Sequence, residues 1–240
     1  MSDFPQHIVR SYAQELKQLR AMLVDMGGLL ENQLLMATTA VVQHDSDAAA
    51  AAMEQDPAVD RLERDIETFV IRMLALRQPV AEDLRQIVAA LKISSDLERI
   101  GDYAANVAKR SIVLSQYSLS FTLGGLNHLA RLVQESLKMT VDAIGENDPV
   151  RALQVWRSDQ VVDDIYTAIF RELITYMMED PRNITPCTHL LFVAKNLERI
   201  GDHATNIAET VHYAATGESL PEGRPKGDNA AFTNVKPRES

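Results

Sequence analysis

Four acidic pairs, each with a spacing of four residues, stand at matching positions of this chain. They are Asp56/Asp60, Glu98/Asp102, Asp159/Asp163 and Glu198/Asp202. Residues four apart lie on one face of a helix, so each pair projects two carboxylates side by side, and the two charges repel. Carboxylate oxygens suit hard or borderline cations such as Mg²⁺, Mn²⁺, Ca²⁺ or iron. The four pairs therefore predict cation binding, against the alternative of solvated helix faces in an acidic protein.

The acidic pairs belong to an internal repeat. The sequence Leu-Glu-Arg-Ile-Gly-Asp at residues 97–102 recurs unchanged at residues 197–202, and Asn106 aligns with Asn206. Upstream of this motif the two halves align at an offset of 103 residues, which matches Asp56 with Asp159 and Asp60 with Asp163. Polar positions agree as well as apolar ones. The chain is therefore interpreted as two copies of one unit.

The repeated motif reads as part of a helix. Leu97, Ile100 and Ala104 recur at core-like spacing, and the acids of the motif fall on roughly the opposite side. The acids are therefore expected to point away from the packed face, with Asn106 and Asn206 as additional oxygen ligands. Arg99 and Arg199 stand beside the acids and are candidates for partner binding or for simple salt bridges.

Apolar periodicity predicts an all-α chain of two tandem three-helix bundles, a spectrin-like internal duplication with up-down topology. The second helix of each bundle is expected to be broken, because Asp56-Pro57 and the matching Asp159 both look like fresh helix starts. Gly27-Gly28 is expected to weaken or bend the first helix, whereas Gly101 and Gly201 suit either close helix approach or access for a ligand to the acidic stripe. The predicted units are residues 1–117 and 118–216, followed by a disordered tail at 217–240.

Composition narrows the class of protein. The chain has 240 residues, a net charge of −10, a pI near 5.1 and one cysteine, Cys187. This charge argues against nucleic acid as a ligand, and the lone cysteine fits a reducing cytosol. No signal peptide and no membrane-spanning stretch are expected. No catalytic triad, Gly-rich phosphate loop or Glu-x-x-His pair stands out, so no catalytic residue and no organic cofactor site are predicted. His203 is expected to be a surface or packing residue.

The doubled motif resembles the PhoU family of phosphate-signalling accessory proteins. The resemblance rests on residues 197–209, their echo at 97–109 and the tripeptide Asp83-Leu84-Arg85, which has no clear copy near residue 184. It implies two three-helix bundles in a cytoplasmic protein that associates with the phosphate ABC transporter at the membrane and couples it to a sensor histidine kinase. It also implies metal binding on the acidic motifs, which map here onto Asp56, Asp60, Glu98, Asp102, Asp159, Asp163, Glu198 and Asp202.

The resulting expectation is a non-enzymatic regulator that restrains the phosphate-starvation response when phosphate is ample. Its metal is left open among iron, zinc, manganese and magnesium, and a homodimer is expected. Two alternatives remain: a carboxylate-cluster metalloenzyme that hydrolyses phosphate esters, and a generic cation-binding helical protein.

Overall fold

The computed structural model describes residues 4–77, 79, 81–117 and 124–221, and these residues form helices joined by short turns. The first bundle contains α1 (Phe4–Gln43), α2 (Ser46–Glu54), α3 (Asp56–Arg77) and α4 (Ala81–Leu114). The second contains α5 (Gly124–Glu146), α6 (Pro149–Glu179), the short 3₁₀ helix η1 (Pro181–Asn183) and α7 (Ile184–Thr216). No strand occurs within the described ranges. The prediction of an all-α chain with two tandem three-helix bundles is confirmed.

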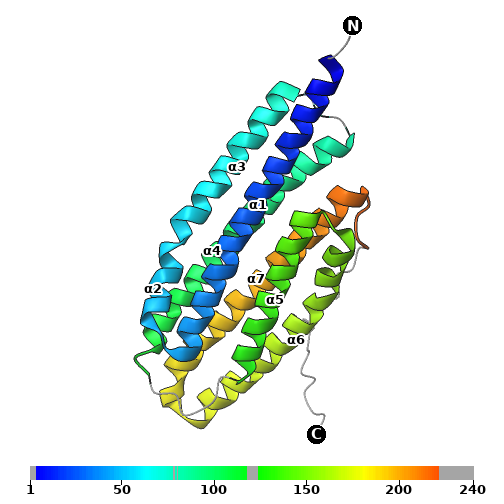
Figure 1. Cartoon of the computed structure of the whole chain (residues 1–240). Coiled ribbons are helices and arrows are strands. Elements are labelled where there is room, and N and C mark those ends of the chain that lie inside the picture. Colours follow the sequence, from blue (N-terminus) through cyan, green and yellow to red (C-terminus); the bar gives the residue numbers. More distant parts are fainter. Residues whose placement is uncertain (1–3, 78, 80, 118–123, 222–240) are drawn as a thin grey trace.

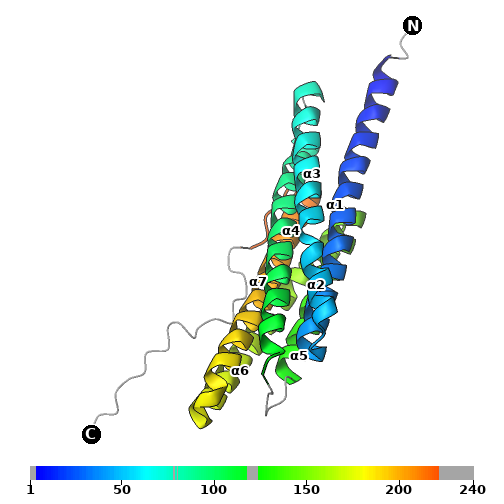
Figure 2. The ribbon, with the colours of Figure 1, turned by 90° about the vertical axis from the view of Figure 1, so that its left-hand side faces the viewer.

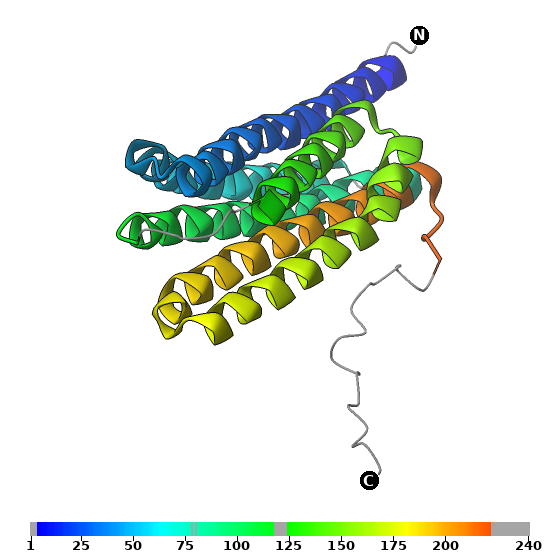
Figure 3. The ribbon, with the colours of Figure 1, turned by 90° about the horizontal axis from the view of Figure 1, so that it is seen from below.

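The two bundles lie side by side, as the ribbon shows from three directions (Figure 1, Figure 2, Figure 3). Across the boundary α4 packs against α7, and α1 packs against α5. Within the bundles, α3 lies beside α4 and α6 lies beside α7. The two helices that carry the repeated motif, α4 and α7, therefore lie in the middle of the molecule, and each also contacts a helix that carries a second acidic pair.

The same corner joins the first helix to the second in both copies. His44 and Asn147 each adopt a left-handed backbone, with φ of 55° and 52°. The next residue is an aspartate that caps the following helix: Asp45 accepts from the backbone N–H groups of residues 47 and 48, and Asp148 from those of residues 150 and 151. This shared turn is structural support for the alignment at an offset of 103 residues.

One detail of the predicted topology is wrong. The second helix is broken only in the first bundle, at Gln55 between α2 and α3, whereas α6 runs without interruption through Asp159. The physical reason is Pro57, which lacks a backbone N–H and whose ring clashes with the preceding turn. The residue aligned with Pro57 is Gln160, which can donate a normal helical hydrogen bond, so the second copy has no cause to break.

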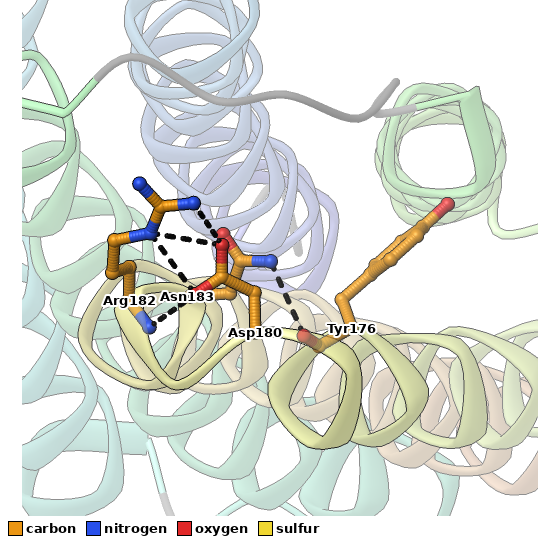
Figure 4. A network of polar contacts seen from close by, with 4 residues as sticks. All are labelled: Tyr176, Asp180, Arg182 and Asn183. Carbon is orange, nitrogen blue, oxygen red and sulfur yellow. Dashed lines mark hydrogen bonds and ion pairs between the residues drawn. The ribbon is translucent and has the colours of Figure 1, made fainter.

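The connection between α6 and α7 is held by a small polar network (Figure 4). Asp180 accepts from the backbone N–H of Arg182 at 2.9 Å, and the Arg182 side chain donates back to both Asp180 oxygens. Asn183 donates from its side chain to the Tyr176 carbonyl oxygen at 3.2 Å. These contacts stop α6 at Asp180, directly before Pro181, and turn the chain into α7.

Gly27 lies where α1 crosses α5. A Cβ built on Gly27 would lie 2.5 Å from Val141 Cγ2, whereas a Cβ on Gly28 would have no atom within 4 Å. Buried residues of both bundles form one continuous apolar core. Gly27 therefore permits close contact between the bundles, a role that the expected bend of the helix did not include.

No helix in the described part of the chain combines the length and the apolar character needed to span a membrane. Of the predicted tail, residues 222–240 lie outside the described residues. The predicted unit boundaries, 1–117 and 118–216, stay predictions.

Neighbouring glycines offer a matched test of the bundle contact. Gly27→Ala is expected to lower the free energy of unfolding by about 1–3 kcal/mol, because the new methyl overlaps Val141. Gly28→Ala is expected to raise it by about 0.5–1 kcal/mol, because alanine favours the helix and nothing obstructs it. Urea unfolding measures both. Equal effects of the two substitutions would show that the α1–α5 contact is looser than described.

Candidate functional site

The acidic pairs are brought together by a close contact between helices. A Cβ built on Gly101 of α4 would lie 3.3 Å from Val59 Cγ1 of α3, and one on Gly201 of α7 would lie 3.2 Å from Val162 Cγ1 of α6. Each valine stands between the two aspartates of its helix, and each glycine stands between the Glu and the Asp of the repeated motif. Both glycines are buried. The glycines therefore act as predicted, by letting one acidic helix approach the other.

In the first bundle, Asp56, Asp60, Glu98 and Asp102 form one half-exposed face, which we call the first acidic face. Burial raises the pKa of the Asp56 carboxyl, Gln33 lowers it through a hydrogen bond, and the charges of Asp102 and Asp60 raise it further. Burial also raises the pKa of Glu98, followed by the charge of Asp102, whereas Arg99 lowers it. These carboxyls influence one another across the two helices.

Glu63 of α3 adds a fifth carboxyl that sequence reasoning missed. Its pKa is raised by burial, then by the charges of Glu67 and Asp60, and Glu63 in turn raises the pKa of Glu98. The second copy has Tyr166 at the aligned position, so a search restricted to repeated acids passes over Glu63. Its position three residues after Asp60, on the same side of the helix, is the signal that could have found it.

The second acidic face, formed by Asp159, Asp163, Glu198 and Asp202, is more deeply buried. Asp159 is 3% exposed, Asp163 8% and Glu198 9%. The expectation that the motif acids point away from packed surfaces is therefore wrong for Glu198, because α6 and α7 pack against each other along their acidic sides, whereas Asp202 is half-exposed. Thr205 Oγ1 donates to Asp159 Oδ1 at 3.0 Å.

A lysine supplies positive charge to the second acidic face. Lys195 Nζ donates to Glu198 Oε1 at 2.7 Å and lies 5.0 Å from the centre of the Tyr166 ring. Burial raises the pKa of Glu198, Lys195 opposes this, and Asp202 and Asp163 add to the rise. The first copy has Ser95 where Lys195 stands. The two faces are thus similar in acids but different in the cation that compensates them.

The two motif arginines occupy different surroundings. Arg99 is 57% exposed in its side chain and lies 3.6 Å from Glu98 Oε2 and 3.5 Å from Asp102 Oδ2. Arg199 instead reaches across to the first bundle, where its guanidinium carbon lies 5.4 Å from the centre of the Tyr103 ring. Only Arg99 therefore lies on an acidic face, and partner binding by Arg99 and Arg199 stays a prediction.

Tyr103 and His203 are aligned residues that face each other between the bundles. Their ring centres are 5.6 Å apart, and His203 Nδ1 lies 2.8 Å from Asp96 Oδ1. His203 is half-buried in this contact. Its surroundings agree with the predicted packing role and hold it away from the acidic faces.

Among the described residues, no three histidine, cysteine or acidic side chains are arranged closely enough to hold a metal ion as they stand. The first acidic face nevertheless has the oxygen donors and the partial exposure that favour a hard cation, and the pKa values of Asp56 and Glu98 are raised first by burial and then by neighbouring carboxylates. The second face fits poorly in this state, because Lys195 already binds Glu198.

Both copies of the repeat match a known protein family. The family model for the PhoU domain matches the chain twice, at residues 23–111 and 126–211. A phosphate-specific transport system accessory protein PhoU homolog from Caulobacter vibrioides is 50% identical over 224 residues, covering 93% of this chain and 97% of the relative. The homolog from Rhizobium meliloti is 47% identical over 223 residues, covering 92% and 94%.

Solved structures agree with these relatives. PhoU from Pseudomonas aeruginosa superposes with a TM-score of 0.84 at 41% identity, covering 86% of this chain and 100% of that one. The phosphate transport system regulatory protein PhoU from Streptococcus pneumoniae superposes with a TM-score of 0.80 at 28% identity, covering 88% and 99%. The chain belongs to the PhoU family, and each of its two bundles carries one PhoU domain.

Proposed function

We propose that this chain is a non-enzymatic accessory regulator of phosphate uptake. The observation that carries the proposal is the 50% identity, over nearly the whole of both proteins, with a relative named as an accessory protein of the phosphate-specific transport system. In this role the chain works in the cytoplasm as a homodimer and reaches the membrane only through its partners. Those partners are the cytoplasmic side of the phosphate ABC transporter and a phosphate-sensor histidine kinase.

The two acidic faces support an adaptor role, since each lies along a pair of helices and offers charge to another protein. The first face is half-exposed and carries Arg99 at its edge, so a partner can meet both signs of charge there. The second face is nearly closed by α6 and α7. A partner with basic groups therefore finds more accessible carboxylates on the first bundle than on the second.

We also propose that the first acidic face binds a divalent cation through Asp56, Asp60, Glu98 and Asp102, with Glu63 beside them. When bound, the cation would neutralise carboxylates of this face, where burial, and after it the neighbouring negative charges, raise the pKa values of Asp56, Glu63 and Glu98. At the second face, Asp159, Asp163, Glu198 and Asp202 would bind a cation only after Lys195 leaves Glu198. The family resemblance adds iron and zinc to manganese and magnesium as candidates.

The difference between the faces predicts the outcome of titration calorimetry with Mn²⁺. Asp60→Asn combined with Asp102→Asn is expected to weaken binding by about tenfold or more. The matched control, Asp163→Asn combined with Asp202→Asn, is expected to leave that binding event unchanged. Lys195→Met is expected to create a second binding event. Equal losses from the two double substitutions would contradict the assignment to the first face.

Cation binding is expected to depend on pH. Because the folded-state pKa values of Asp56 and Glu98 are raised, the protonated carboxyls contribute stability that is lost as pH rises through those values. Mn²⁺ is therefore expected to increase the melting temperature more at pH 7.5 than at pH 5. A thermal shift that is independent of pH would contradict binding at these carboxyls.

Deleting the gene that encodes this chain tests the regulatory proposal. In phosphate-rich medium a phosphate-starvation reporter is expected to rise, because the kinase loses its restraint, and a plasmid copy of the wild-type chain is expected to restore repression. Reporter activity is measured in both strains at high and low phosphate. An unchanged reporter in the deletion strain at high phosphate would rule out the proposed negative regulation.

A further inference from the structure

An open groove of about 810 Å³ lies between the start of α4 and the end of α7, away from both acidic faces. The two helix ends lie beside each other at one end of the molecule (Figure 1). Residues 219–221, which follow α7, form a third wall. The groove is lined by side chains of the tripeptide that the sequence singled out, since Leu84 and Arg85 both border it.

Two cations line this groove. Arg85 Nε is buried and has no hydrogen-bond partner within the described part of the chain. Gly217 ends α7 with φ of 77° and lies beside this guanidinium, since a Cβ built there would be in van der Waals contact with it, 3.4 Å from Arg85 Cζ. Lys92 is exposed and, among the described residues, forms no ion pair. The groove carboxylate Glu209 accepts instead from Trp156 Nε1 at 3.0 Å. In a chain with a net charge of −10, this is a locally cationic wall.

The internal repeat places an equivalent site at the start of α7 and the end of α4, and there side chains fill the space. At the other end of the α4–α7 pair, the Arg110 guanidinium lies 4.1 Å from the centre of the Phe192 ring and 3.4 Å from His189 Nδ1. The residues aligned with these three are Thr210, Lys92 and Ala89. Two of the three are much smaller than the residues they replace. The groove is therefore open because Ala89 of the first copy and Thr210 of the second stand where His189 and Arg110 fill its counterpart.

Apolar side chains form the edges of the open groove. Leu84 is 40% exposed, Val88 41% and Tyr213 43%. Leu84 and Val88 are one helical turn apart on α4, and Tyr213 faces the groove from α7. Exposed apolar residues at this spacing, combined with cations that lack partners, are typical of surfaces that receive a segment of another protein.

We propose that this groove docks an acidic segment of the phosphate transporter's cytoplasmic portion, with apolar side chains on one face. Its carboxylates pair with Arg85 and Lys92, and its apolar side chains pack on Leu84, Val88 and Tyr213. A carboxylate of the segment can accept hydrogen bonds from the half-buried Arg85 guanidinium. This inference rests on the proposed function, since it takes the transporter as the partner.

The test measures binding of the full-length chain to the purified transporter in nanodiscs by biolayer interferometry. Arg85→Glu combined with Lys92→Glu is expected to weaken binding by about tenfold or more, because both pairs become repulsive. Thr210→Arg is expected to weaken binding similarly, because the new side chain is the one found at the aligned residue, Arg110, and it would fill the groove. Lys138→Glu, an exposed change of the same sign on α5, is the matched control and is expected to leave binding unchanged.

A photo-crosslinking residue at Val88 identifies the occupant directly. Mass spectrometry is expected to place the crosslink on an acidic segment of the transporter. Crosslinks to a second copy of the chain, to residues 222–240 or to a basic segment would overturn the proposal. Equal binding by the wild type and the folded groove variants, with folding checked by circular dichroism, would also overturn it while leaving the proposed function standing. Failure of the wild type to bind the transporter would instead overturn the choice of partner and both conclusions.

Discussion

The contact of Gly101 with Val59, and its copy between Gly201 and Val162, sets how closely the acid-bearing helices approach. Any side chain at either glycine would press against the facing valine methyls, which lie 3.3 Å and 3.2 Å from a built Cβ. In the first copy Gln33 fixes the same meeting point. It is fully buried and donates to the Ala52 carbonyl at 3.1 Å and the Gly101 carbonyl at 3.4 Å. The approach that builds the core thus also buries and crowds the carboxylates, and burial, followed by neighbouring negative charge, raises the pKa values of Asp56, Glu98 and Glu198.

The two copies compensate the crowded carboxylates in different ways. The second brings in Lys195, whose ammonium group hydrogen-bonds Glu198 and lies over Tyr166. The first has Ser95 and Glu63 at the aligned positions, which removes a cation and adds a carboxyl. Arg99 lies at the exposed edge of the first face, 3.6 Å from Glu98 Oε2 and 3.5 Å from Asp102 Oδ2, whereas Lys195 binds Glu198 on the buried second face. Duplication followed by these two changes therefore leaves the second face compensated by a half-buried lysine, and the first face with five carboxyls beside the exposed Arg99.

The sequence predicted most of the fold because the duplication doubled every signal. The αL corner before Asp45 and its copy before Asp148, the glycine contacts and the break at Asp180 all follow from local chemistry. The uninterrupted α6 could also have been predicted, because the aligned residue is Gln160 and only Pro57 breaks a helix. Burial of Asp159 and Glu198 could not, since one helical wheel does not show which flank meets the neighbouring helix. Glu63 and Lys195 could not be found from the repeat for another reason: each occurs in one copy alone, so an alignment of the two copies does not mark it.

The groove at Arg85 and the first acidic face both involve α4, and together they set a requirement for any partner that contacts both. Leu84 and Val88 precede Glu98 and Asp102 by fourteen residues, so they point within about 40° of the same direction, roughly 20 Å apart along the axis. A single surface lying along α4 therefore meets cations and apolar edges at one end and carboxylates at the other. Such a surface needs acidic groups for Arg85 and Lys92 and either basic groups or a shared cation for Asp102. Opposite charges at a fixed separation also impose a direction, because a partner docked in reverse would bring like charges together at both ends.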